Sequence, residues 1–370
     1  MAKPSISLCM ITKNEEKYLP KCLSSVKHIV DEIIIVDTGS TDDTLAIAKS
    51  FGAKVIQMPW QNSFADARNR SFDEATGDWI LWLDADEEMD ADGTDKLKEL
   101  LTRDSVREQR IEGIQFVFCN HLEGGGLEYN YVTRIVRNRP QYRFEGRIHE
   151  QILPSMLRLD PHLQLGQVDV HVHHYGYLTQ NVIEQDKGRR NIALLQQAIS
   201  EHPHYPYYYY YWSVELYRDH DLEGALRNMN VFLNMVGMRA GKALLSRAHK
   251  YRLIMLADLK RYDDLIRYSE ESIARFPGFT DLYHFSAMGY NALGDTSKAV
   301  DVLRHAQRIG PAEKEYPSIA GHGTYLTCQE LGRLYASAGN SKNADLYFTL
   351  ASLMIGDSRI KYQEPQVSLL

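Results

Sequence analysis

Residues 32–36 form the apolar run Glu-Ile-Ile-Ile-Val, in which polar and apolar residues do not alternate. A strand with one face in water shows that alternation, whereas a strand of a parallel sheet covered on both faces lacks it. Comparable apolar runs at residues 6–11, 54–58 and 79–83 are also predicted to be strands. Helical patterns lie between the strands, at residues 15–26, 41–51 and 64–76. This order of strand and helix predicts an α/β domain with right-handed crossovers between parallel strands.

The pattern changes after the first hundred residues. Residues 113–120, 131–137 and 168–173 are predicted to be strands of a more irregular, partly antiparallel region, so we expect a mixed sheet. From about Asn181 the chain is expected to be helical. We therefore place an α/β domain at 1–180, an all-α domain at 181–360 and a tail at 361–370.

Two segments of the helical region repeat the same spacing of small and large residues. The first carries Tyr283, Ala287, Tyr290, Gly294, Ala299, Leu303, Ala306 and Pro311. The second carries Gly332, Tyr335, Gly339, Ala344, Phe348 and Ala351. This spacing is typical of tetratricopeptide repeats of roughly 34 residues. Weaker copies lie at 209–232 and 253–277, and an ordinary helical bundle is the alternative.

Composition narrows the classes of partner and the compartment. The formal net charge of −7 and the scattered Lys and Arg residues give no reason to expect nucleic-acid binding. The four cysteines are far apart and form no CxxC pair, which favours reduced thiols in the cytoplasm. No apolar stretch approaches 18 residues, so we expect no transmembrane segment.

The most informative motif is Trp-Ile-Leu-Trp-Leu-Asp-Ala-Asp-Glu-Glu at residues 79–88. An apolar strand there ends in four carboxylates within five residues, and carboxylates so close together repel one another. Open α/β sheets bind ligands at the carboxyl ends of their strands. An Asp-x-Asp pair at that place can hold Mg²⁺ or Mn²⁺ against a diphosphate. The alternative is simply an acidic start to the next helix.

Further polar segments follow the other expected strands. Asp37 ends the second strand, where its carboxylate could accept a hydrogen bond from a base or ribose, while Ser40 or Thr41 could cap the next helix. Residues 11–16 follow the first strand. In residues 63–69, Arg68 could hold phosphate or the acidic motif, or could lie on the helix surface.

Taken in order, the segments ITKNEE, VDTGSTDDT, FADARNR and GDWILWLDADEE resemble family 2 nucleotide-diphospho-sugar transferases over residues 4–180. The resemblance implies a GT-A fold, a Rossmann-like α/β domain with a mixed sheet, and a UDP-sugar as donor. It implies that Thr12 and Asp37 contact uracil, that Arg68 lies beside the diphosphate and that Asp84 contacts the ribose or sugar. Asp86 is implied as the metal ligand. The same motifs add the donor-binding positions Asn14, Glu15, Ser40, Asp66 and Ala85.

The catalytic base is expected in residues 143–151, a polar cluster after a strand. Inverting transfer requires a carboxylate to take the acceptor's proton. The GxIHE segment resembles the acceptor-side segment of a bacterial subgroup, which implies Glu150 as base, with His149 orienting it or acting itself. His174 is expected to complete the metal site beside Asp86, unless it is a structural histidine. The QxxRW motif of processive synthases is absent from the sequence.

That subgroup carries trailing tetratricopeptide repeats and includes peptide S-glycosyltransferases of bacteriocin maturation. The resemblance therefore implies a peptide or protein acceptor, modified on Cys or on Ser/Thr. One alternative is a glycosyltransferase of cell-wall or lipid-linked glycan synthesis. The other is a repeat scaffold with a decayed catalytic domain, which the intact Asp84 and Asp86 disfavour. Repeats of this kind often self-associate, so a homodimer is also expected.

Overall fold

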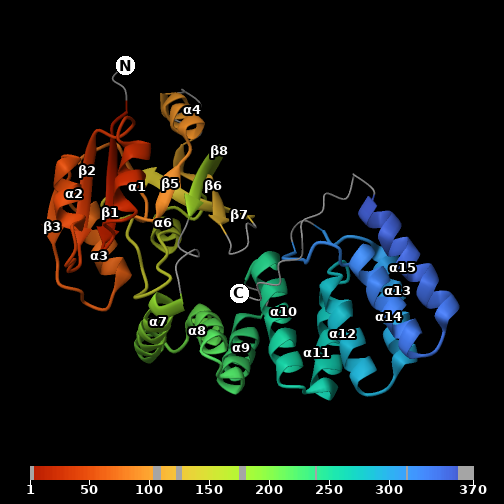
Figure 1. Ribbon diagram of the computed structural model, residues 1–370. Helices are drawn as coiled ribbons and strands as arrows, with labels where there is room; N and C mark the ends of the chain where they lie inside the picture. The colour runs from red at the N-terminus through yellow and green to blue at the C-terminus, as the bar shows by residue number, and fades with distance from the viewer. Residues whose placement is uncertain are drawn as a thin grey trace. The chain divides into compact units, whose positions relative to one another are not determined.

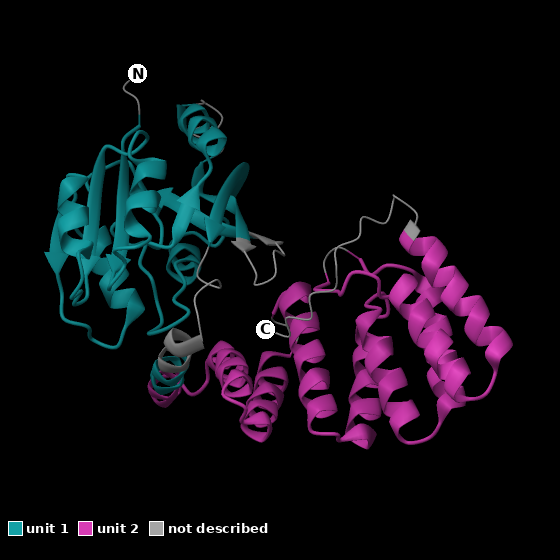
Figure 2. Cartoon of the chain, viewed as in Figure 1, with its two compact units in different colours: residues 1–194 teal, residues 195–370 magenta. Residues whose placement is uncertain are grey.

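The fold is taken from a computed structural model that describes residues 4–102, 110–121, 127–174, 181–237, 240–313 and 316–356. The chain divides into two compact units, residues 1–194 and 195–370, which Figure 2 colours separately. The tail expected at 361–370 lies outside the described residues.

The first unit contains an eight-stranded mixed sheet with the order β3-β2-β1-β4-β7-β6-β8-β5 (Figure 1). Its strands are β1 Ile6–Thr12, β2 Glu32–Asp37, β3 Lys54–Gln57, β4 Trp79–Trp82, β5 Glu87–Met89, β6 Ile111–His121, β7 Leu127–Arg137 and β8 Gln164–His174. β1 to β4 are parallel, β7 runs antiparallel to β4, and β5 runs antiparallel to β8. The prediction of a parallel half and a partly antiparallel half is confirmed.

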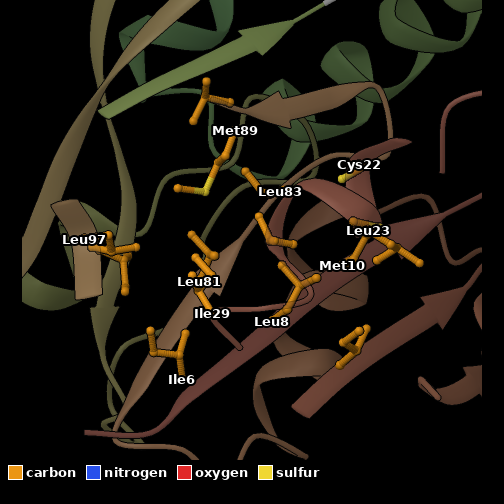
Figure 3. Packing of buried hydrophobic residues seen from close by; sticks show 14 of the residues in the cluster. Ile6, Leu8, Met10, Cys22, Leu23, Ile29, Leu81, Leu83, Met89 and Leu97 are labelled. Atoms are coloured by element: carbon orange, nitrogen blue, oxygen red, sulfur yellow. The ribbon is translucent and has the colours of Figure 1, made fainter. Parts of the chain in front are cut away.

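Helices cover both faces of the sheet, as the unbroken apolar strands require. The helices of this unit include α1 Leu19–Val26, α2 Thr44–Ser50, α3 Phe64–Phe72, α4 Ala91–Thr102 and α6 Leu153–Leu159. Along β1 the buried side chains alternate between the two faces: Leu8 and Met10 pack in one cluster with α1, α2 and α4 (Figure 3), and Cys9 packs in the other with α3 and α6. The parallel strands are thereby held rigidly, with their carboxyl ends at one edge.

Two of the predicted helices begin later than their apolar patterns suggested. α1 begins at Leu19 instead of Glu15, with a proline in its first turn, and residues 16–18 form a turn before it. α2 begins at Thr44 instead of Thr41, so Asp42 precedes the helix and does not lie in its first turn. The Asp42 carboxylate instead accepts a hydrogen bond from the Thr44 amide at 3.1 Å.

The second unit is built from successive helical hairpins. α7 Asn181–Glu201 crosses from the first unit into the second, and the hairpins are α8 Pro206–Arg218 with α9 Leu222–Val236, α10 Lys242–Asp258 with α11 Tyr262–Arg275, α12 Asp281–Ala292 with α13 Thr296–Ile309, and α14 Tyr325–Ser337 with α15 Ser341–Gly356. Among the described residues, no helix combines the length and apolarity needed to cross a bilayer.

The same turn closes all four hairpins, which shows that the weaker copies belong to the repeat. A residue with positive φ lies two positions after the first helix of each pair: His220, Lys260, Gly294 and Gly339. In every case the next residue donates its amide to the carbonyl five positions earlier, as Asp295 does to Tyr290 at 2.9 Å. These bonds satisfy the last carbonyls of the first helix and fix the chain reversal.

This turn predicts opposite effects for two substitutions. Lys260→Gly should stabilise the protein by about 0.5–1 kcal/mol, because Lys260 holds φ at +55° where a side chain is strained. Gly294→Ala should destabilise it by about 1 kcal/mol, because Gly294 has φ at +86°, where a side chain is strained. The added methyl group meets open space, so a steric clash does not contribute to this loss. Thermal unfolding of the full chain, followed by circular dichroism, measures both. Shifts of the same sign would contradict the shared left-handed turn.

Candidate active site

The carboxyl ends of β1, β2 and β4 meet at one edge of the sheet, and the polar segments that follow them come together there. A cavity of about 780 Å³ lies at this edge. Of the residues predicted to form the site, those that line the cavity are Thr12, Glu15, Arg68, Asp84, Ala85, Asp86, His149, Glu150 and His174. Asn14, Asp37, Ser40 and Asp66 are not among the lining residues.

Asp37 is buried behind the cavity, where it organises the turn that follows β2. Its Oδ1 accepts the amides of Gly39 and Ser40 at 3.1 and 3.0 Å, and its Oδ2 accepts the hydroxyls of Ser40 and Thr12. Ser40 also accepts the amide of Asn14 at 2.9 Å, and it does not cap α2, whose N-cap residue is Asp43. Asp37 thus shapes the turn that follows β2, while Thr12 and the adjacent Thr38 line the cavity.

The four carboxylates of residues 84–88 do not act as one cluster, which corrects the interpretation of the whole run as a cation site. Asp84 and Asp86 line the cavity. Glu87 is 2% exposed and forms an ion pair with Arg134 of β7. Glu88 pairs with Lys21 at 2.7 Å. Of these four carboxylates, Asp84 and Asp86 are the two that face the cavity.

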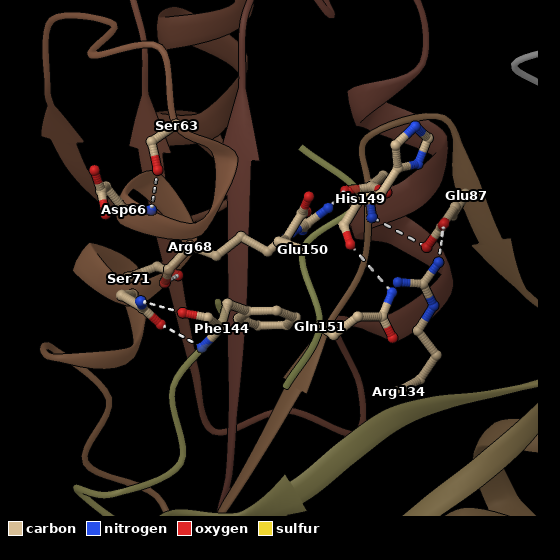
Figure 4. A network of polar contacts seen from close by, with 12 residues as sticks. Ser63, Asp66, Arg68, Ser71, Glu87, Arg134, Phe144, His149, Glu150 and Gln151 are labelled. Atoms are coloured by element: carbon tan, nitrogen blue, oxygen red, sulfur yellow. Dashed lines mark hydrogen bonds and ion pairs between the residues drawn. The ribbon is translucent and has the colours of Figure 1, made fainter. Parts of the chain in front are cut away.

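Arg68 joins the two halves of the predicted site. It lies on the inner face of α3, and its Nη2 donates to Asp84 Oδ1 at 2.8 Å while its Nε donates to Glu150 Oε1 at 2.6 Å. Figure 4 shows Arg68 extending toward Glu150. The alternative of a surface arginine is excluded, because Arg68 is 8% exposed.

The charges around Arg68 stabilise one another. Burial lowers the pKa of the Arg68 guanidinium, but Asp84 and Glu150 outweigh burial and hold that pKa well above its usual value. Burial raises the pKa of Asp84, yet Arg68 and Arg134 outweigh it and lower the pKa to about 2. Asp84 is therefore ionised at any physiological pH, and its charge is partly neutralised from within the protein.

His174 lies beside Asp86, as the sequence suggested. β5 pairs with β8 so that Glu87 is opposite His174, and this register brings His174 Nε2 to 3.4 Å from Asp86 Oδ2. Burial lowers the pKa of His174, but the hydrogen bond and charge of Asp86 outweigh burial and raise it. A carboxylate and an imidazole fit a divalent cation. Among the described residues no group of three or more ligating side chains is found.

Sequence reasoning missed several residues of the cavity wall. Trp60, Phe64, Arg134 and Arg190 line the cavity beside the predicted set. Phe64 was accessible from the sequence, because it precedes Arg68 by one helical turn and so shares its face. Arg134 could have been found as a charge within the apolar run of a strand. Arg190 comes from α7, more than a hundred residues after Arg68 in the sequence, and no local pattern indicates that placement.

Comparison with known proteins identifies the chain. A family model described as Glycosyl transferase family 2 matches residues 7–107. The TPR repeat-containing protein Synpcc7942_0270 of Synechococcus elongatus is 31% identical over 84% of this chain and 77% of its own length. The chain belongs to glycosyl transferase family 2. The SPbeta prophage-derived glycosyltransferase SunS of Bacillus subtilis is 27% identical over 76% of this chain and 66% of that protein.

The protein is thus a glycosyltransferase with tetratricopeptide-like repeats, and both predictions are confirmed. Glucosyl-3-phosphoglycerate synthase from Mycobacterium tuberculosis, solved with Mn²⁺, uridine diphosphate and phosphoglyceric acid, aligns with 53% of this chain and 78% of that chain. Its TM-score is 0.40 at 18% sequence identity. The family match holds Arg68, Asp84 and Asp86 but ends before Glu150 and His174.

Proposed function

We propose that this glycosyltransferase moves a sugar from a UDP-sugar to a Cys, Ser or Thr side chain of a peptide or protein, with inversion and with bound Mg²⁺ or Mn²⁺. The observation that carries the proposal is the position of Arg68. One guanidinium holds both Asp84, on the donor side, and Glu150, in the segment expected to face the acceptor. Asp84 and Glu150 line the same cavity, which supports the proposal that donor and acceptor bind there side by side.

The donor half requires charge compensation. The cavity is lined by the carboxylates of Glu15, Asp84, Asp86 and Glu150 and by the basic groups of Lys13, Arg68, Arg134 and Arg190, of which Arg68 and Arg134 already form ion pairs with carboxylates. A diphosphate placed beside Asp84 and Asp86 would be repelled by their two carboxylates. A divalent cation held by Asp86 and His174 would supply the missing positive charge and stabilise the departing diphosphate. Thr12 and Thr38 line the part of the cavity in which we place the uridine.

On the acceptor side, Glu150 is proposed as the general base. The thiol or hydroxyl of the acceptor gives its proton to the Glu150 carboxylate as sulfur or oxygen bonds to the anomeric carbon. The bond from that carbon to the diphosphate breaks on the opposite side, and the diphosphate leaves with the bonding electrons. Arg68 orients Glu150 through the 2.6 Å hydrogen bond between Nε and Oε1. His149, next to it on the cavity wall, is the alternative base.

The second unit motivates the choice of acceptor. Arrays of helical hairpins present extended surfaces that commonly bind polypeptide chains. The four cysteines are free and buried, which fits a reducing compartment, so we place the reaction in the cytoplasm. We also propose that the protein forms a homodimer through the repeats. Analytical sedimentation measures this oligomeric state.

Donor binding is tested by thermal shift with a panel of nucleotide sugars, each with and without Mn²⁺. We expect stabilisation by one UDP-sugar that depends on Mn²⁺, because ligand binding to the folded state alone raises its stability. Stabilisation by a sugar attached to another nucleotide would correct the base. A chain that no donor stabilises in either condition would overturn the proposal.

The acceptor is tested once the donor is known. The enzyme is incubated with that donor and, separately, with a peptide library containing Cys, Ser and Thr and with a panel of glycan and lipid-linked acceptors. Mass spectrometry should detect added sugar on peptides. Transfer confined to glycans or lipids would overturn the acceptor class and leave the donor assignment intact.

A further inference from the structure

Glu87 closes the turn that carries the two aspartates of the cavity. Its Oε2 accepts the amide of Asp84 at 3.0 Å, and its own amide donates to the Asp84 carbonyl at 3.0 Å. These reciprocal bonds fix the backbone on both sides of Ala85 and Asp86. The direction in which Asp86 points therefore depends on Glu87, although Glu87 does not line the cavity itself.

Arg134 holds the other oxygen of Glu87. Its guanidinium pairs with Glu87 Oε1, an ion pair drawn with a dashed line in Figure 4. Its Cζ lies 4.9 Å from the centre of the Phe118 ring, and that ring lies 5.4 Å from the ring of His174. Arg134 thus links the turn that presents Asp86 to the strand that presents His174. The side chains of Glu87 and Arg134 are 1% and 9% exposed.

Burying such a pair is costly, and apolar residues of similar volume often serve stability equally well. Stability alone therefore gives a weak reason for its presence. Both partners of Glu87, the Asp84 amide and the Arg134 guanidinium, are hydrogen-bond donors. Both carboxylate oxygens of Glu87 must therefore accept, and no neutral side chain can replace the carboxylate. We infer that Glu87 and Arg134 are positioning residues that set the affinity of the Asp86–His174 pair for a divalent cation. This inference rests on the proposed function.

The test measures Mn²⁺ binding by the loss of the free-ion electron paramagnetic resonance signal, with MnCl₂ alone and with added UDP. Glu87→Gln keeps the size of the side chain but loses one acceptor, and it should weaken Mn²⁺ binding by about tenfold or more, as removal of groups that orient metal ligands does. Saturating Mn²⁺ should then restore transfer. Arg134→Lys keeps the charge but loses the planar fork, and it should act in the same direction.

Glu88→Gln is the matched control, because it removes a carboxylate from the next residue, which pairs with Lys21 at 2.7 Å. If charge alone mattered, Glu88→Gln would weaken Mn²⁺ binding equally; we expect a change of less than about twofold. Loss of thermal stability with unchanged Mn²⁺ affinity in both Glu87→Gln and Arg134→Lys would overturn the inference. Failure of the wild-type protein to bind Mn²⁺ with UDP would instead overturn the proposed function.

Discussion

Asp86→Ala is expected to lower kcat/KM for sugar transfer by about 10³-fold or more, while the fold stays intact. The substitution removes one of the two side chains that would hold the cation, and a metal ion contributes several kcal/mol to stabilising developing charge on a leaving group. Asp86 ends no strand and its side chain is about one-fifth exposed, so the sheet does not depend on it. Initial rates at several Mn²⁺ concentrations, with the donor found by thermal shift, measure the effect.

Glu88→Ala is the control for that substitution, since Glu88 is two residues away and pairs with Lys21. It should retain nearly the full rate. The added Mn²⁺ should rescue Asp86→Ala poorly, because His174 would remain as the single ligand of the pair. An Asp86→Ala enzyme that works at the wild-type rate would show that the cation, if one is used, is held elsewhere.

The fold was accessible from the sequence because its strongest determinants are local. The run Ile33 to Val36 has no polar alternation, and the structure buries it between helices on both faces. The positions of helix starts were less accessible, because Asp42 and Glu15 lie outside the helices and hydrogen-bond to Thr44, the first residue of α2, while the apolar periodicity continues through them. The repeats were found where glycine marks the hairpin turn, as at Gly294, and were weak where Lys260 fills the same conformation.

The candidate site was predictable to the extent that strand order gathers its residues at one edge. Asp84 and Asp86 follow β4 directly, so their placement needed only the parallel sheet. The ion pair between Arg68 and Glu150 could not be predicted from strand order. Glu150 lies 82 positions after Arg68 in an irregular segment, and only tertiary packing brings its Oε1 within 2.6 Å of Arg68 Nε. The division of the acidic run between cavity and interior likewise depends on Arg134, a residue of a distant strand.

Glu150→Gln is expected to lower the rate of transfer by about 10³-fold while donor binding changes by less than about twofold, since a positioned base typically contributes 10²–10⁴-fold. Gln keeps the size of the side chain and has an oxygen that can accept from Arg68 Nε, in place of the Glu150 Oε1 that lies 2.6 Å from it. It cannot take a proton from the acceptor at neutral pH. Single-turnover transfer and thermal shift with donor, measured on the same preparations, separate the two effects.

The control must make the same chemical change in the same segment without touching the cavity. Glu145→Gln does so, because Glu145 pairs with Arg158 and is not among the cavity-lining residues. We expect it to transfer sugar at nearly the wild-type rate. His149→Asn tests the neighbouring alternative: if His149→Asn stops transfer and Glu150→Gln does not, the imidazole is the base and Glu150 only orients Arg68. Loss of donor binding in Glu150→Gln would place Glu150 in the donor site, because its charge would then be needed to hold Arg68 against Asp84.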